Sequence, residues 1–225
     1  MAIAFDHYTD GQFASGSLTF SHTCTSADLL FVQVYEFSGA LTVTGVTYNS
    51  VSMTALATNV NSAHIANHMS VYYLVAPSSG AHNVVITQSG SNTILGQALS
   101  YSGTSASQFG ATVLGVETTS PSGSFTEAIT TTGANSWVVI FIGTSGGTPT
   151  SGSNTTVRGA MAGQGYFAVA DSGLLAAAGA KSLVVNDASN EFQNAIMAEM
   201  LVAGGGGGSN WGPMLGQQLN RLVQG

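Results

Sequence analysis

The chain has 225 residues, only 6% of them charged, and a formal net charge of −7 at pH 7. Charged residues make up roughly 25% of an average globular protein, so Ser, Thr, Asn, Gln and Gly must form most of this surface. Arg158, Lys181 and Arg221 are the only strong bases, which leaves no basic patch for nucleic acid or anionic lipid. Neither nucleic acid nor a membrane is expected as a partner.

The N-terminal segment, MAIAFDHYTDGQFASG, has no basic region and no apolar run of signal-peptide length, so standard export is not expected. Cys24 is the only cysteine; it excludes an intrachain disulfide and a thiolate metal cluster, and predicts a small buried hydrophobe. A Ser/Thr/Gly-rich surface without an export signal is typical of a virion component, which folds in the host cytoplasm and is exposed after lysis. An expression product with its signal removed would fit as well.

Strand signals then recur at short intervals, each bounded by Gly, Ser or Asn, and no amphipathic helix pattern precedes the C-terminal tail. The pattern predicts an all-β fold, a two-sheet antiparallel sandwich that is jelly-roll-like, followed by a short C-terminal amphipathic peptide. The expected strands are Ser17–Cys24, Asp28–Phe37, Leu41–Tyr48, Ser52–Ala57, Met69–Val75, His82–Gln88, Gly96–Ser102, Ser124–Thr130, Ser136–Gly143, Tyr166–Asp171, Ser182–Asn186 and Phe192–Val202.

Several of these strands are apolar on both faces, among them the runs LLFVQVY, WVVIFI and AIMAEMLV. Such runs are typical of central strands in a sandwich, or of strands that a neighbouring subunit covers. The residues expected in the core are Leu18, Phe20, Leu30, Val32, Val34, Val71, Tyr73, Val84, Ile86, Trp137, Val139, Phe141 and Ile196.

The expected domain organisation is one β-sandwich domain over residues 1–203, followed by a glycine tether and docking peptide over residues 204–225. The one candidate internal boundary is Gly103–Ser122, which is rich in Ser, Gly and Thr and holds only a weak apolar element, Phe109–Val116. A split there would leave two halves of plausible domain size. One domain is preferred because the later strands can complete sheets begun by the earlier ones. The stretch 145–154, SGGTPTSGSN, predicts a long exposed loop.

The tail is the strongest functional signal, because the five glycines Gly204–Gly208 separate the body from an amphipathic peptide. Its periodic run is shorter than the roughly 12–15 residues at which an isolated helix becomes marginally stable, so the peptide needs a surface to lie on. A tether that extends up to roughly 3.5 Å per residue can reach a neighbouring subunit as easily as its own body. A frayed terminus is the alternative interpretation. The residues expected to bind a partner are Trp211, Met214, Leu215, Leu219, Leu222 and Val223.

Two groups of residues have the composition of metal sites, but neither has a complete pattern, and no metal or cofactor is expected. His64 and His68 are four residues apart, which suits two imidazoles on one helical face, yet no third ligand can be assigned and an exposed polar loop is favoured. Asp187, Asn190 and Glu191 gather oxygens that suit Ca²⁺, but their spacing matches no defined calcium loop and turn chemistry explains them better.

No nucleophile elbow, dinucleotide fingerprint or P-loop occurs, and no catalytic residue is assigned. A glycosidase would need two carboxylates facing each other across a cleft, and the sequence places no two together. The glutamates considered are Glu36, Glu117, Glu127 and Glu199. Aromatic rings can present a platform to a glycan, although most here alternate with core residues and are expected to pack. The rings considered are Tyr8, Tyr48, Tyr72, Tyr101, Tyr166 and Trp211.

A resemblance covers Ser17–Ser107 and the closing strand Ala195–Val202, and its motifs are structural ones, a strand, a turn and a strand. The segments that carry it are Ser17–Phe37, Leu41–Leu56, Met69–Thr87 and Gly96–Thr104. Together they resemble a diffuse group of β-sandwich domains found in tailed-bacteriophage structural proteins and bacterial surface proteins, a resemblance that supplies no catalytic residues. With the tethered tail, it implies a non-enzymatic component of a tailed-phage virion, such as a capsid decoration protein or another head or tail accessory. Such a protein would contact copies of itself and other virion proteins such as the major capsid protein. A carbohydrate-binding or adhesive module is the alternative.

Overall fold

The computed structural model describes residues 1–36, 42–61, 68–117, 122–144, 146–161 and 167–204. Strands dominate this part of the chain, and the described residues form no helix. In particular, they include no helix of the length and apolarity that a membrane crossing requires.

The strands fall into two series along the chain. The first series is β1 (Ala4–Ser15), β2 (Leu18–Cys24), β3 (Leu29–Glu36), β4 (Val43–Tyr48), β5 (Val51–Ser52), β6 (Thr54–Asn61), β7 (His68–Val75), β8 (Gly80–Gln88) and β9 (Thr93–Ser102). The second series is β10 (Thr104–Glu117), β11 (Ser122–Thr131), β12 (Trp137–Thr144), β13 (Pro149–Ser151), β14 (Thr156–Met161), β15 (Phe167–Asp171), β16 (Gly179–Glu191) and β17 (Gln193–Val202).

Each series folds into its own jelly roll, here called the N-terminal repeat (residues 4–102) and the C-terminal repeat (residues 104–202). The N-terminal repeat has an inner sheet of order β1-β9-β3-β7-β6 and an outer sheet of order β2-β8-β4-β5. The C-terminal repeat has an inner sheet of order β10-β17-β12-β15-β14 and an outer sheet of order β11-β16-β13. The two orders match strand for strand from β1 and β10 to β9 and β17, and among the described strands only β5 lacks a counterpart.

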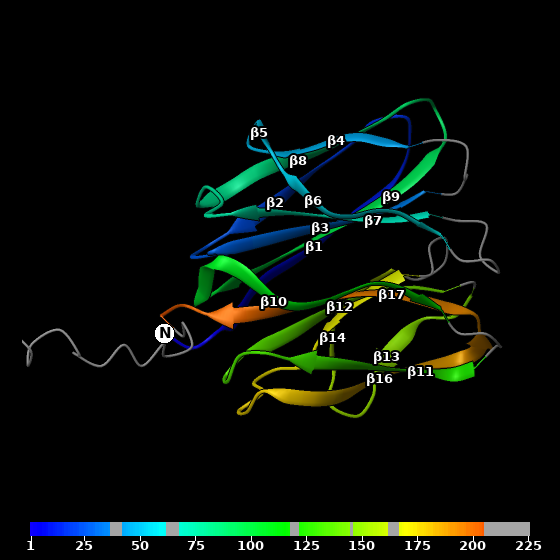
Figure 1. Cartoon of the computed structure of the whole chain (residues 1–225). Coiled ribbons are helices and arrows are strands. Elements are labelled where there is room, and N and C mark those ends of the chain that lie inside the picture. The colour runs from blue at the N-terminus through cyan, green and yellow to red at the C-terminus, as the bar shows by residue number, and fades with distance from the viewer. Residues whose placement is uncertain (37–41, 62–67, 118–121, 145, 162–166, 205–225) are drawn as a thin grey trace, which may run out of the picture.

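The inner sheets of the two repeats pack face to face, so the body has four layers (Figure 1). The equivalent strands β3 and β12 meet at the centre, where the rings of Phe31 and Phe141 lie 5.3 Å apart. At the margins β1 contacts β14 and β6 contacts β10. Because β1 is equivalent to β10 and β6 to β14, exchanging the repeats turns the first contact into the second. An approximate two-fold axis therefore relates the repeats.

The burial of the strands follows from this layering. β3 and nearly all of β12 are buried on both faces, because each inner sheet packs against an outer sheet on one side and against the other repeat on the other. β2 instead alternates between buried and exposed residues, as an outer strand should. Each doubly apolar run is therefore covered by the other repeat of the same chain.

The expected antiparallel all-β sandwich is confirmed, with four sheets where the sequence predicted two. The extra sheets arise because each half closes its own sandwich before the inner faces meet. Of the expected core residues, Phe20, Tyr73 and Trp137 are partly buried and the other ten are buried. One hydrophobic cluster takes residues from both repeats; the single domain over 1–203 stays a prediction.

Strands β1 and β10 were not expected, because their sequences are mostly polar or glycine-containing, yet they pair along β9 and β17. The candidate boundary Gly103–Ser122 is thus largely strand. The loop expected over 145–154 contains β13, and the turn expected at 186–191 lies within β16. The tether and peptide over 205–225 lie outside the described residues.

The central contact between the repeats can be tested by the substitution Phe141→Ala. Removing this buried ring should lower the free energy of unfolding by about 3–5 kcal/mol, measured by urea denaturation. Because the inner sheets cover each other, both repeats should unfold in one transition at the lower midpoint. The control Val51→Ala, at a residue 49% exposed, should change stability by less than about 0.5 kcal/mol. Loss of structure in the C-terminal repeat alone would contradict the shared core.

Candidate functional site

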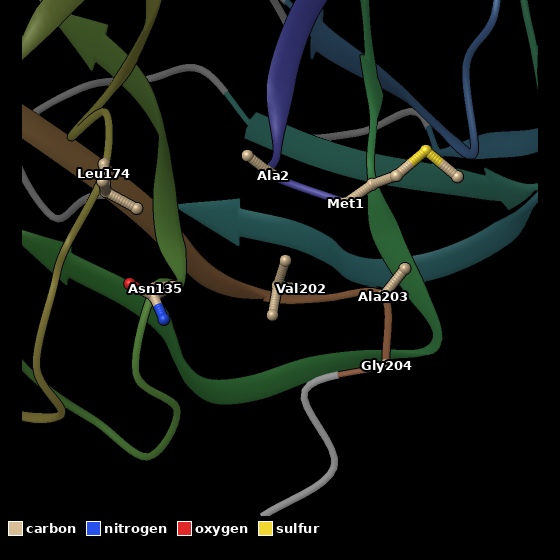
Figure 2. Close-up of a pocket in the computed structure, with 7 residues that line it drawn as sticks. All are labelled: Met1, Ala2, Asn135, Leu174, Val202, Ala203 and Gly204. Carbon is tan, nitrogen blue, oxygen red and sulfur yellow. The ribbon is translucent and has the colours of Figure 1, made fainter.

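An open pocket of about 370 Å³ lies where the described chain ends (Figure 2). It is formed by the start of the chain, the turn before β12, the loop after β15 and the end of β17. The lining residues are Met1, Ala2, Asn135, Leu174, Val202, Ala203 and Gly204. This group, here called the tail-root pocket, brings together segments that are far apart in the sequence.

Backbone contacts hold the walls of the tail-root pocket in place. The Ala203 N–H donates to the Gly103 carbonyl at 2.8 Å, and the Leu175 N–H donates to the Ser136 carbonyl at 2.9 Å. Gly103 has φ +74°, and a Cβ there would lie 2.0 Å from the Ala2 carbonyl oxygen. Only glycine therefore permits this close approach between the chain start and the junction of the two repeats.

The tail-root pocket concentrates exposed apolar side chains. Four large hydrophobic side chains are exposed in the described part of the chain, and two of them, Met1 (93%) and Leu174 (59%), line this pocket. The other two, Val51 and Leu114, lie elsewhere. Every lining side chain is uncharged, so the side chains of the pocket suit an apolar ligand.

The residues predicted to bind a partner all follow Gly204, and Gly204 itself lines the pocket. Trp211, Met214, Leu215, Leu219, Leu222 and Val223 lie outside the described residues. Sequence reasoning missed Met1, Asn135 and Leu174 as surface partners. No local signal marks them, because only the fold brings these separate segments together.

A second concave surface, of about 350 Å³, lies on the outer sheet of the N-terminal repeat and is polar. It is lined by Asn49, Ser50, Ala81, His82, Asn83 and Val85. It lacks an aromatic platform among its lining residues. Of the rings considered for glycan binding, Tyr48, Tyr72 and Tyr101 are buried, Tyr8 is partly buried and hydrogen-bonded to Gln97 at 2.9 Å, and Tyr166 and Trp211 lie outside the described residues.

The candidate metal groups do not assemble into a described cluster. His68 lies in β7 directly opposite Glu36 in β3, whereas His64 lies outside the described residues. Asp187 is buried and accepts a hydrogen bond from the Gln193 amide at 3.4 Å. Among the described residues, no three His, Cys, Asp or Glu side chains gather closely enough to hold a metal ion.

The candidate catalytic glutamates are separated by the layers. Glu36 points with Val34 into the N-terminal repeat, and Glu199 points with Met197 into the C-terminal repeat. Two sheets lie between these interiors, so Glu36 and Glu199 do not face each other across a cleft. Glu117 ends β10, and Glu127 lies midway along β11.

Glu199 serves as a structural anion. Its carboxylate accepts hydrogen bonds from the backbone N–H groups of Ala111, Thr132 and Gly133, at 2.8 to 3.0 Å. Burial opposes its ionisation, but these hydrogen bonds outweigh burial and lower the pKa of the carboxyl. Glu199 thereby fastens β10 and the turn before β12 to β17.

The pKa of the Glu36 carboxyl shifts in the opposite direction to that of Glu199. It is 1% exposed, and neither carboxylate oxygen has a hydrogen-bond partner among the described residues. Burial raises the pKa of its carboxyl to about 7. The facing His68 Nδ1 is likewise unpaired within the described part of the chain. Glu36 therefore keeps a proton at pH values where an exposed glutamate is charged.

A buried polar network inside the N-terminal repeat joins β1, β2 and β9. Ser100 donates to the Asp6 carboxylate at 2.8 Å and lies 3.2 Å from His22 Nε2, while His22 Nδ1 lies 3.1 Å from the Thr9 hydroxyl. Burial, and next the charge of His7, lower the pKa of His22 to about 4 against the opposing effect of Asp6. Ser100 is fully buried, so the Ser100 hydroxyl beside His22 and Asp6 is closed to substrate.

One ion pair joins charged side chains in the described part of the chain, and it lies at the interface between the repeats. Arg158 Nε lies 2.6 Å from Asp171 Oδ2, and Arg158 Nη2 lies 3.0 Å from Oδ1. Tyr101 of the N-terminal repeat donates to the same carboxylate at 3.0 Å, and the guanidinium lies 4.8 Å from the ring centre of Phe5. The hydrogen bond to Asp171 raises the pKa of Arg158.

Replacing Arg158 by Gln should show how strongly this interface depends on the ion pair. Asp171 is fully buried, so losing its counter-charge should lower the free energy of unfolding by about 3 kcal/mol in a urea titration at pH 7. The control Tyr101→Phe, which removes one neutral donor and leaves the ion pair, should cost about 1 kcal/mol. Equal effects of the two variants would argue against a dominant role for the charge.

Glu36→Gln should change the pH dependence of stability. The Glu36 carboxyl releases its proton near pH 4.5 in the unfolded chain and near pH 7 in the folded chain. Between these pH values the folded state binds more protons than the unfolded state, so Glu36 makes stability fall as pH rises. At pH 8 the variant should therefore be more stable than the wild type, by about 3 kcal/mol, while near pH 4 the two should agree. Glu199→Gln is the matched control and should be destabilising at pH 8. A wild-type pH profile retained by Glu36→Gln would refute this role.

No family model matches the chain, and no curated protein matches it. Among solved structures it is similar to a family GH115 4-O-methyl-α-glucuronidase (16% identity, TM-score 0.29), over 38% of this chain and 13% of that one. It is also similar to the major capsid protein P2 of bacteriophage PM2 (10% identity, TM-score 0.29), over 89% of this chain and 97% of that one. A conserved protein of unknown function from Pseudomonas aeruginosa PAO1 matches at 10% identity and TM-score 0.31, over 86% and 80%. The chain spans about an eighth of the glucuronidase, and likenesses this weak carry no functional argument.

Proposed function

We propose that this protein is a non-enzymatic structural component of a tailed-phage virion, a capsid decoration protein or another head or tail accessory. It associates with copies of itself and with other virion proteins such as the major capsid protein, and its C-terminal peptide fastens it to the particle. The observation that carries the proposal is an exposed apolar pocket at the root of a glycine-tethered apolar peptide.

The placement of the ionisable groups supports a structural role. Glu199 is held by backbone N–H groups and Asp171 by Arg158, so these buried anions stabilise the fold. Glu36 and Glu199 lie in different sandwich interiors, where a glycosidase would need a facing pair. Jelly rolls also occur in viral capsid proteins, which is support by analogy of fold alone.

The binding mechanism would be burial of apolar area. Each square ångström removed from water contributes roughly 25 cal/mol before the entropy of association is subtracted. A stripe that includes Trp211, Leu215 and Leu219 can bury substantial area without any charged contact. Such binding suits a chain that has only three strong bases with which to form ion pairs. Many identical copies fastened in this way would reinforce a shell.

Removing residues 205–225 tests the proposal directly. The shortened protein should keep the thermal midpoint of the full chain, because the described body ends at Gly204, but it should be absent from purified particles analysed by quantitative mass spectrometry. A full-length control with Gln217→Ala and Gln224→Ala, on the polar face of the peptide, should be retained. Wild-type occupancy by the shortened protein would exclude the tail as the anchor.

The alternative is a carbohydrate-binding or adhesive module, and the polar pocket around His82 and Asn83 is the surface that favours it. Glycan-array binding by the full chain, abolished by His82→Ala together with Asn83→Ala, would support that function. A virion fastener should bind no sugar and still require its tail, so the two experiments separate the candidates.

A further inference from the structure

We infer that the tail-root pocket is the receptor for the C-terminal peptide of a second copy of this chain, and that two copies exchange their peptides reciprocally. The inference rests on the proposed function only in assigning the tail a binding role. It adds the identity of the partner and the surface that receives the peptide.

The chemistry of the pocket matches that of the peptide. Met1 and Leu174 expose apolar side chains at the opening, and Asn135 adds an uncharged amide at the turn before β12 (Figure 2). The sequence periodicity predicts an apolar stripe from Trp211 to Val223 on one helical face and Arg221 on the opposite face, so the stripe is expected to carry no charged side chain. The apolar side chains of the two surfaces can bury each other without burying a charged side chain.

The pocket is already formed before any peptide binds. The backbone hydrogen bond from Leu175 to Ser136 fixes the loop that carries Leu174, and the bond from Ala203 to Gly103 fixes the end of β17. A preformed receptor reduces the ordering cost of binding to that of the peptide itself.

The position of the pocket selects the arrangement of the two copies. Gly204 is both a lining residue and the first residue of the tether, so each copy has its receptor beside the point where its own peptide departs. Two copies that face each other across a two-fold axis at this point would each receive the other's peptide. Such an exchange is isologous and closes at two copies; it does not propagate into a filament.

The size of the pocket favours a second copy over the peptide's own body. As a helix, the stripe from Trp211 to Val223 is about 18 Å long, whereas an open pocket of about 370 Å³ holds only the side chains at one end of it. On a single body the rest of the stripe would remain in water; between two facing bodies, the second body covers it. The seven residue steps from Gly204 to Trp211 extend to roughly 24 Å, enough to cross such an interface.

Disulfide trapping between different copies tests the exchange. One full-length copy carries Leu174→Cys and a mass tag, and the other carries Leu215→Cys; the natural Cys24 is buried and stays in both. Under mild oxidation the mixture should give a disulfide-linked species of one copy of each kind. Val51→Cys, at a similarly exposed apolar residue of the N-terminal repeat, replaces Leu174→Cys in the matched control and should reduce the yield by roughly tenfold or more.

Three results would overturn the inference. The first is an intrachain disulfide, in a protein of monomer mass, when one chain carries both Leu174→Cys and Leu215→Cys, because such a bond forms only if the peptide binds its own body. A yield equal to that of the Val51→Cys control is the second. The third is an unchanged dimer mass for full-length Leu174→Asp in analytical ultracentrifugation, with folding checked by circular dichroism.

The outcome is distinguishable from failure of the proposed function. If the shortened chain is lost from particles but no linked pair forms, the tail is an anchor and its receptor lies elsewhere. If the linked pair forms but particle occupancy does not depend on residues 205–225, the exchange stands and the tail is not the anchor to the particle.

Discussion

The rest of the structure depends on the mutual burial of the two inner sheets. A jelly roll normally leaves one face of each sheet in water, but here β3, β12 and β17 are apolar on both faces and would be exposed if the repeats separated. Their contact also satisfies buried polar groups from each side. Gln33 donates to the Ile142 carbonyl at 3.2 Å, and Tyr101 donates to Asp171. Apolar packing and hydrogen bonding therefore select the same arrangement of the repeats.

The scarcity of charged residues has one consequence inside the body and another at its surface. Inside the body, Glu199 and Asp171 have defined donors, so the few anions there stabilise particular strand positions. Outside, a surface with few charged residues and a net negative charge offers little electrostatic attraction to an anionic partner. Recognition must then come from shape and apolar area, and Met1 and Leu174 supply such area at the opening of the pocket.

The sequence predicted the sheets better than their arrangement. Alternation and doubly apolar runs located most strands, and ten of the expected core residues are buried, because both signals are local. The two-fold relation of the repeats was missed, since equivalent strands such as β3 and β12 share burial but little sequence. β1 was missed because its polar residues pair with β9, far along the chain. The tail-root pocket has no linear signal beyond Gly204, because its walls meet only in the folded protein.

The joining of the repeats at Gly103 has a further consequence. An interface with the same two-fold relation between separate subunits would dissociate on dilution, since its stability would depend on subunit concentration. Here the two halves belong to one chain, and Gly103 also contacts the chain start and the end of β17. The body can therefore remain folded at any concentration, from the crowded interior of a cell to a nearly empty medium, while contacts between separate copies remain free to respond to dilution.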